Sequence, residues 1–173
     1  MGLSEWILLC LPAFAANALP VLFSGNTPID QGYRFADGNP FLGKSKTFRG
    51  FLAGVAGGTI VGMVLAYQFK EFLPGLTGTE KVAASFLLST GTMIGDATGS
   101  FIKRRIGLAS GQKAMTDAVT FMLFALGLAL AAFPTVGNLL GFEGLLFVMG
   151  FTVVCHRFFN WIAHRLKLKI VPW

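Results

Sequence analysis

Apolar residues gather in five long runs along the 173-residue chain, and polar residues concentrate between them. The runs cover about residues 5–23, 48–69, 81–102, 114–133 and 143–163. A helix needs ~20 mostly apolar residues to cross the hydrocarbon core of a bilayer, and each run is long enough to do so. The pattern therefore predicts an all-α integral membrane protein, a bundle of five transmembrane helices that forms a single domain over residues 1–173.

The composition excludes a soluble globule. Hydrophobic residues make up 54% of the chain and charged residues 13%, which leaves too little polar surface to cover a water-soluble fold. We expect the first apolar run to be retained as a helix, because the basic segment that opens a signal peptide is missing. Cys10 and Cys155 both lie inside apolar runs, so we expect buried free thiols.

Basic residues fall almost entirely on one side of the predicted membrane. Twelve of the 14 Lys and Arg residues lie in or beside segments 24–47 and 103–113 or near the carboxyl end, and only Lys70 and Lys81 fall opposite. The positive-inside rule then places both segments in the cytoplasm as loops, with the amino terminus outside and the carboxyl terminus inside. We expect a multi-pass protein of the cell membrane whose active site faces the cytoplasm.

The basic residues also indicate partners. They adjoin apolar runs, where membrane retention and phosphate binding explain them better than nucleic acid does, so we expect no nucleic acid partner. The carboxyl-terminal residues that suit anionic membrane lipids and an aromatic anchor are Arg165, Lys167, Lys169 and Trp173.

Two apolar runs carry glycines at every fourth position. Gly50, Gly54, Gly58 and Gly62 form one stripe, and Gly91, Gly95 and Gly99 form another. Such stripes let helices approach closely. We expect the second and third helices to pair through these faces, and a homodimer in which one stripe meets a symmetry mate is the alternative.

The strongest candidate chemistry lies in residues 95–117, which join the third and fourth runs. Asp96 and Asp117 stand at the membrane edge, where a carboxylate costs free energy unless it has a function. If the helix continues past Asp96, then Gly99, Ser100 and Lys103 share its face. Carboxylates hold hard cations, and the basic side chains hold phosphates, so the segment suits a metal-bound polyphosphate. The basic residues in question are Lys103, Arg104, Arg105 and Lys113.

The loop 24–47 is the second candidate. Asp37-Gly38-Asn39-Pro40 has the chemistry of a turn, and the basic run 43–49 leads into a helix amino terminus, which attracts anions. The run is not a Walker A loop, because its first glycine lies too far away and no strand precedes it. A membrane-retention signal is the alternative interpretation. The side chains that could hydrogen-bond a base are Asn26, Asn39, Ser45 and Thr47, and the sequence does not rank them.

These motifs resemble a known family. Gly95-Asp96, the run 100–104 and Asp117 are similar to the cytidylyltransferase signature of integral membrane enzymes that make CDP-lipids. With Asp37-Gly38-Asn39-Pro40, the run 42–50 and the closing Val171-Pro172-Trp173, the chain resembles the archaeal branch, the CDP-archaeol synthases. The longer bacterial pattern also has a Lys-Asp and a His-Gly-Gly that are missing here, so their roles are not transferred.

The resemblance implies a reaction: CTP and an unsaturated archaeal ether-lipid phosphate with isoprenoid chains give CDP-archaeol and pyrophosphate. It implies that Asp96 and Asp117 hold Mg²⁺, as a pair of ions, and act in catalysis together with Lys103. A lipid phosphate is already largely anionic at neutral pH, so we expect no general base and no catalytic role for His156 or His164. The implied substrate-binding residues are Asp37, Gly38, Asn39, Lys44, Ser45, Lys46, Thr47, Arg49, Ser100, Arg104 and Lys113.

Two other functions fit part of the pattern. A small transporter or channel could use Asp96 as its ion or proton site, but the polar residues gather at one membrane face and no matching site stands in the outer half. A CDP-alcohol phosphotransferase carries several aspartates in one spaced run, whereas the Asp-Gly at Asp37 stands alone here.

Overall fold

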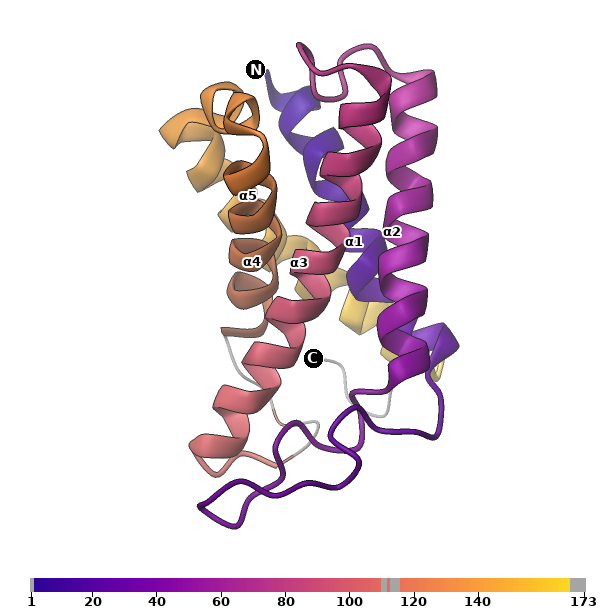
Figure 1. Ribbon diagram of the computed structural model, residues 1–173, viewed down its shortest axis with the longest axis vertical. Helices are drawn as coiled ribbons and strands as arrows, with labels where there is room; N and C mark the ends of the chain where they lie inside the picture. Colours follow the sequence, from indigo (N-terminus) through magenta and orange to yellow (C-terminus); the bar gives the residue numbers. More distant parts are fainter. Residues whose placement is uncertain (1, 110–111, 113–115, 169–173) are drawn as a thin grey trace.

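The computed structural model describes residues 2–109, 112 and 116–168, and over these ranges the chain is helical with one long ordered loop. The helices form an elongated bundle, with α3 between α4 and α2 in the view of Figure 1. Their bounds are α1 Leu3–Phe23, α2 Phe48–Gln68, α3 Gly78–Arg105, α4 Thr116–Ala132 and α5 Pro134–Arg165.

The expected all-helical membrane architecture is confirmed, while the number of crossings is not fully tested. Within the described ranges, α1, α2 and α5 are long and apolar enough to cross a membrane. The helix Asp117–Ala132 is apolar but shorter, and α3 has 28 residues with many polar side chains. Five crossings therefore stay a prediction that rests on α3 and α4.

Helix α3 is longer at both ends than the expected span 81–102. The Thr77 hydroxyl accepts the Glu80 N–H at 3.4 Å, and the Glu80 carboxylate accepts the Thr77 N–H at 2.7 Å, so this capping box starts the helix early. The helix ends at Arg105, before Gly107 at φ 78°. The expected loop 103–113 included Lys103 and Arg104. In the structure both residues lie on the last turn of α3.

The fifth helix also departs from the expected span 143–163. The structure extends it back to Pro134, which follows shortly after the end of α4 at Ala132 and opens α5, because its ring fits the first helical turn. Val136 and Leu140 of this added segment are buried, which is the packing that holds it helical. Gly141, at φ 60° and ψ −178°, then breaks the helix, and the expected span corresponds to the part after this break.

The glycine stripes pack differently from the prediction. The α2 stripe does face α3, where side chains at Gly58 and Gly62 would strike Ser89 and Ser85, but it also meets α1. The α3 stripe faces α4 instead: a Cβ at Gly95 would lie 2.6 Å from the Phe121 Cα. Both stripes are thus covered within one chain, so they leave no glycine face for the homodimer considered from the sequence.

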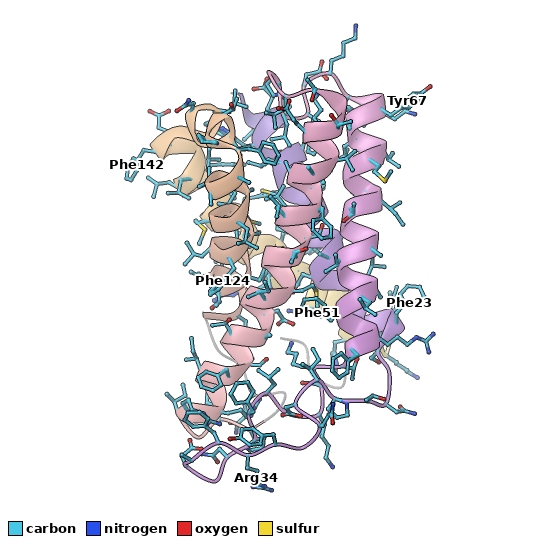
Figure 2. All side chains as sticks on the ribbon, in the orientation of Figure 1. Phe23, Arg34, Phe51, Tyr67, Phe124 and Phe142 are labelled. Carbon is cyan, nitrogen blue, oxygen red and sulfur yellow. The ribbon has the colours of Figure 1, made fainter. Side chains whose placement is uncertain are left out.

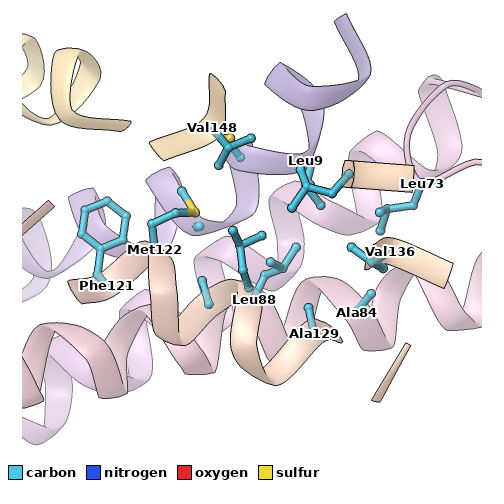
Figure 3. Packing of buried hydrophobic residues seen from close by; sticks show 14 of the residues in the cluster. Leu9, Leu73, Ala84, Leu88, Phe121, Met122, Ala129, Val136 and Val148 are labelled. Carbon is cyan, nitrogen blue, oxygen red and sulfur yellow. The ribbon is translucent and has the colours of Figure 1, made fainter. Parts of the chain in front are cut away.

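The apolar core lies between the helices and extends to Ala118 and Phe121 on the first turns of α4. Figure 3 shows Leu9 of α1, Leu88 of α3, Ala129 of α4 and Val148 of α5 meeting in this cluster. Leu73, from the connection between α2 and α3, closes it and is fully buried. This arrangement makes α3 and α4 a rigid frame, and their polar ends project from it toward the loop.

Candidate active site

The polar elements gather at one end of the bundle. The loop 24–47, the carboxyl end of α3 and the start of α4 lie together there, away from the amino terminus (Figure 1). Arg34 marks this end in Figure 2, and Tyr67 lies at the opposite end. The described candidate residues therefore lie at one end of the bundle, as the sequence predicts. They come from segments that are far apart in the chain.

The first carboxylate, Asp96 on α3, is ion-paired with Lys46 of the loop. Both side chains are partly exposed, at 27% and 20%. A small cavity of about 30 Å³ adjoins the pair and is also lined by Ser45 and Met93. The Asp96 carboxylate thus faces the loop, and Lys46 offsets its charge.

The second carboxylate, Asp117, lies on the first turn of α4. The Lys103 Nζ contacts its two oxygens at 2.8 and 2.9 Å. The continued helix places Lys103 two turns after Asp96, as the sequence predicted, and Ser100 between them is buried. Each of the two candidate acids therefore has a lysine of its own.

Arg104 is the most deeply buried basic side chain of the site, at 5% exposed. It donates to the Leu108 carbonyl, but its Nε is buried without a hydrogen-bond partner. The Nε stands beside Gly43, where an added Cβ would lie 3.6 Å from it. A buried guanidinium with a free donor next to a glycine loop suits an anionic ligand.

Asp30 braces the loop and was not identified from the sequence. Its carboxylate accepts the N–H groups of Gly43 at 2.7 Å, Leu42 at 2.9 Å and Gly32 at 3.1 Å. Partial burial acts to raise its pKa, but these backbone donors outweigh it and hold the pKa below its usual value. The glycine-rich stretch before Lys44 is thereby fixed in place. The only sequence signal for the role of Asp30 was its residue type, because an aspartate ahead of glycines often organises a turn.

Residues 33–41 form a short hairpin, which we call the 33–41 hairpin. The Phe35 N–H donates to the Asn39 carbonyl and the Phe41 N–H to the Tyr33 carbonyl, both at 2.9 Å. Asp37 accepts the Asn39 N–H at 3.0 Å, and Gly38 adopts φ 78°, as the predicted turn requires. The hairpin rests on Arg105 of α3, whose guanidinium meets the Asp37 carboxylate at 2.9 Å.

The remaining candidates are divided between different places. Thr47 is the N-cap of α2, where its hydroxyl accepts N–H groups from Gly50 at 3.1 Å and Gly25 at 3.2 Å. Arg49 packs its stem on Gly25 and lines a separate open hollow of about 690 Å³ beside Leu52, away from Lys46. Lys44 and Ser45 are exposed beside Lys46. Lys113 and the closing residues 171–173 lie outside the described residues.

The donor chemistry fits magnesium bound together with a nucleotide. No cluster of three or more His, Cys, Asp or Glu side chains occurs in the described ranges, so the protein offers two carboxylates and no full cage. Mg²⁺ is commonly bound by one or two carboxylates with phosphate oxygens and water as its other ligands. Asp96 and Asp117 would hold the ion, and the paired lysines would meet the phosphates.

An apolar groove opens next to the acid site. It has a volume of about 170 Å³ and lies between α1, α4 and α5. Its α4 wall is Phe121, one turn past Asp117 on the same helix. Val21, Leu22, Ile162 and Leu166 line much of the rest. The groove is the size of part of a hydrocarbon chain, and its Phe121 wall is one helical turn from the second carboxylate.

The chain matches a family model described as CarS-like, CDP-archaeol synthase, over residues 3–173. It is 42% identical over 164 residues to a protein of Thermococcus gammatolerans named CDP-archaeol synthase, covering 94% of this chain and 92% of that one. A protein of the same name from Archaeoglobus fulgidus is 40% identical over 174 residues, with coverage of 97% and 95%. None of these relatives is described as a transporter or channel.

A solved structure resembles the fold. Its description is "Structural insight into an intramembrane enzyme for archaeal membrane lipids biosynthesis", and it superposes with a TM-score of 0.78. The two chains are 31% identical, and the match covers 92% of this chain and 94% of the other. The similarity thus spans the helices and the loop that carry the candidate site.

Proposed function

The chain belongs to the CDP-archaeol synthase family, and we propose that it joins CTP to an archaeal ether-lipid phosphate to give CDP-archaeol and pyrophosphate. The observation that carries the proposal is the pair of lysine-neutralised carboxylates on adjacent helices, Lys46 with Asp96 and Lys103 with Asp117. Such a site accepts a metal-bound triphosphate without leaving a charge unbalanced.

The reaction is a nucleotidyl transfer. An oxygen of the lipid phosphate forms a bond to the α-phosphorus of CTP, and the bond from that phosphorus to the bridging oxygen of the β-phosphate breaks. Pyrophosphate leaves with the electron pair. The second pKa of a phosphate monoester is about 6, so the nucleophile is largely a dianion at neutral pH and needs no base. The protein's contribution is to position the reactants and offset their charge.

We assign the lysines to the phosphates. Asp96 and Asp117 would hold Mg²⁺, which would supply charge neutralisation of the reacting phosphoryl group. Lys46 and Lys103, which lie against these carboxylates, would contact the phosphate oxygens of CTP through their flexible ammonium side chains. The buried Arg104 presents its unpartnered Nε to the same ligand.

We assign the groove beside Phe121 to an isoprenoid chain of the lipid substrate. A chain that lies along α1 and α5 leaves its phosphate near Asp117, where α4 begins. The site then opens to the bilayer for the lipid and to the loop for CTP. The distribution of Lys and Arg supports a cytoplasmic location of the loop side.

The test is pyrophosphate release by the purified protein. We expect release with CTP, a geranylgeranylated glycerol phosphate ether and Mg²⁺ together, and none when either substrate is omitted. Ala163→Phe, which fills the groove, should raise the KM for the lipid phosphate and leave the KM for CTP unchanged. Ala53→Phe, in the hollow beside Arg49, is the matched control. Equal turnover with ATP, GTP and UTP would contradict a cytidylyltransferase.

A further inference from the structure

The Arg105 guanidinium, at the end of α3, is contacted by polar groups and by aromatic rings. Nη1 meets the Asp37 carboxylate at 2.9 Å, and Nη2 donates to the Pro40 carbonyl at 2.6 Å. The guanidinium carbon lies 4.7 Å from the Phe35 ring centroid and 4.9 Å from that of Phe101. The side chain is 18% exposed, so these contacts form in a partly desolvated place.

Aromatic packing extends the same attachment. The Phe101 ring of α3 stands edge-on to Phe35 at 5.6 Å and contacts Phe41 with centroids 4.9 Å apart. Both loop rings belong to the 33–41 hairpin, one on each of its arms. Arg105 and Phe101 therefore hold the hairpin against α3 by an ion pair, cation–π contacts and aromatic contacts together.

The hairpin leads directly into the residues assigned to the nucleotide. After Phe41 the chain reaches Leu42 and Gly43, which Asp30 ties down, and then Lys46, which reaches Asp96. Asp96 and Arg105 lie on the same unbroken helix, nine residues apart. Helix α3 thus holds the segment from the 33–41 hairpin to Lys46 at both of its ends. The positions of Lys44 and Lys46 relative to Asp96 depend on both attachments.

We propose that Arg105 is a positioning residue for CTP: it clamps the 33–41 hairpin to α3, so that Lys44 and Lys46 face the carboxylates, and Asp37 serves this clamp instead of contacting substrate. The inference rests on the proposed function and deepens it. Arg is required because a planar fork reaches a carboxylate and a carbonyl while it stacks on two rings, which a lysine ammonium cannot do. Asp37 is already engaged by Arg105 and by the Asn39 amide.

Steady-state kinetics test the positioning role. For Arg105→Ala we expect the KM for CTP to rise about tenfold, the KM for the lipid phosphate to stay unchanged and kcat to fall less than about threefold, on the scale of a lost charged hydrogen bond. Arg105→Lys should resemble Arg105→Ala more than the wild type. Arg157→Ala, an exposed arginine of α5, should leave all three values unchanged.

A double-mutant cycle tests the assignment of Asp37. Asp37→Asn should raise the KM for CTP in the wild-type background and add nothing in the Arg105→Ala background, because the carboxylate then has no clamp to serve. Effects that multiply in the double variant would place Asp37 on the nucleotide and overturn this part of the inference.

Amide hydrogen exchange gives a readout that does not depend on activity. Without substrates, Arg105→Ala should exchange the Phe35 and Phe41 amides faster than the wild type does, with unchanged protection in the core of α3. Faster exchange with an unaltered KM for CTP would show a clamp that positions nothing, and a raised KM with unaltered exchange would place Arg105 on the nucleotide. Either result overturns the inference. A wild-type protein that releases no pyrophosphate overturns the proposed function instead.

Discussion

Lysines from different parts of the chain neutralise Asp96 and Asp117, and this pairing defines the site at the scale of single residues. Lys46 is 50 positions from Asp96 in the sequence, and Lys103 is 14 positions from Asp117. An isolated carboxylate beside an apolar core would be costly, and the paired lysines offset the charge of the two acids and hold their side chains in place. The pairs thus prepare the site for a ligand with balanced charge.

Loss of either acid should abolish the reaction in a way that is not additive. Asp96→Asn and Asp117→Asn keep side-chain size but remove the charge that offsets the metal, so pyrophosphate release should fall at least about 100-fold in each. The double variant should resemble either single one, because a site that needs both ligands is disabled by losing one.

The controls for this prediction are carboxylate and histidine changes elsewhere. Glu143→Gln, an exposed change of the same chemistry on α5, should leave turnover unaltered. At saturating lipid phosphate, His156→Phe in the groove wall and His164→Gln should keep most of the kcat, since the nucleophile arrives deprotonated. Near-normal pyrophosphate release by Asp96→Asn, together with lost ion or proton flux in liposomes, would support the transporter interpretation instead.

Asp30 makes a prediction about pH. Its folded-state pKa is lowered by backbone donors despite some burial, so its stabilising contribution is complete above the unfolded value of about 3.9 and is lost as pH falls through the folded value. Protection of the Leu42 and Gly43 amides, corrected for intrinsic exchange, should therefore stay constant from about pH 7 to 5. Asp30→Asn should remove it across that range and raise the KM for CTP about tenfold. Full protection in Asp30→Asn would contradict the bracing role.

At the scale of elements, α3 and α4 approach so closely that glycine is required. A Cβ at Gly91 would strike the Phe124 carbonyl oxygen and lie 2.7 Å from the Ala125 Cα, and both are backbone atoms that move only if a helix moves. Asp96 and Asp117 are carried by these two helices. The glycine stripe of α3 therefore sets the spacing of the two acids as well as the packing.

Gly91→Ala should destabilise the protein and reduce activity together. Forcing the helices apart should cost roughly 1–3 kcal/mol, the scale of overpacking, and shift the thermal midpoint in detergent downward. Gly127→Ala is the matched control, because nothing lies within 4 Å of the added Cβ and the change should stabilise α4 by about 0.5–1 kcal/mol. Equal midpoints for the two variants would contradict the close approach.

The elements also show where sequence interpretation succeeds and where it stops. The start of α2 was predictable because Thr47 is a capping residue ahead of an apolar run. The helix that packs on the glycine stripe of α3 was not predictable, because periodicity identifies a helix face and not the element that covers it. The fourth helix ends before Pro134, in agreement with the expected span. The start of α5 at this proline was not predictable, because it depends on the burial of Val136 in the fold.

The same limit applies to the site. Asp96, Asp117 and the basic run were predictable as chemistry, because acids and lysines at a membrane edge are costly unless used. The three consecutive basic residues of α3 look alike in the sequence, yet successive helical positions point about 100° apart. Lys103 therefore meets Asp117, Arg104 enters the interior and Arg105 clamps the hairpin. The role of each basic residue therefore depends on which groups the fold places opposite its side chain.

At the scale of the whole molecule, the two ends of the bundle differ in charge. The acids at the end with the amino terminus are all glutamates, Glu5, Glu71, Glu80 and Glu143, and Lys70 and Lys81 are the basic residues of those segments. The aspartates and, among the described residues, the basic side chains of the loop 24–47 and of the carboxyl end of α3 lie at the other end. The positive-inside rule predicts that the basic end lies in the cytoplasm, where the proposed site would meet CTP through the loop.

Orientation and the number of crossings can be tested together by labelling single cysteines in a background that lacks Cys10 and Cys155. If all five helices cross, positions along the chain should alternate between the two sides of the membrane, beginning outside. A membrane-impermeant maleimide on intact cells should label Leu3→Cys, Thr79→Cys and Glu143→Cys. It should label Ser45→Cys, Ala109→Cys and Leu168→Cys only after the membrane is opened. The informative step is from position 79 to 109, because α3 is long but too polar to be identified as a span from composition. Access to both positions from outside would mean that α3 does not cross, and the acid site would then lie on the wrong side for cytoplasmic CTP.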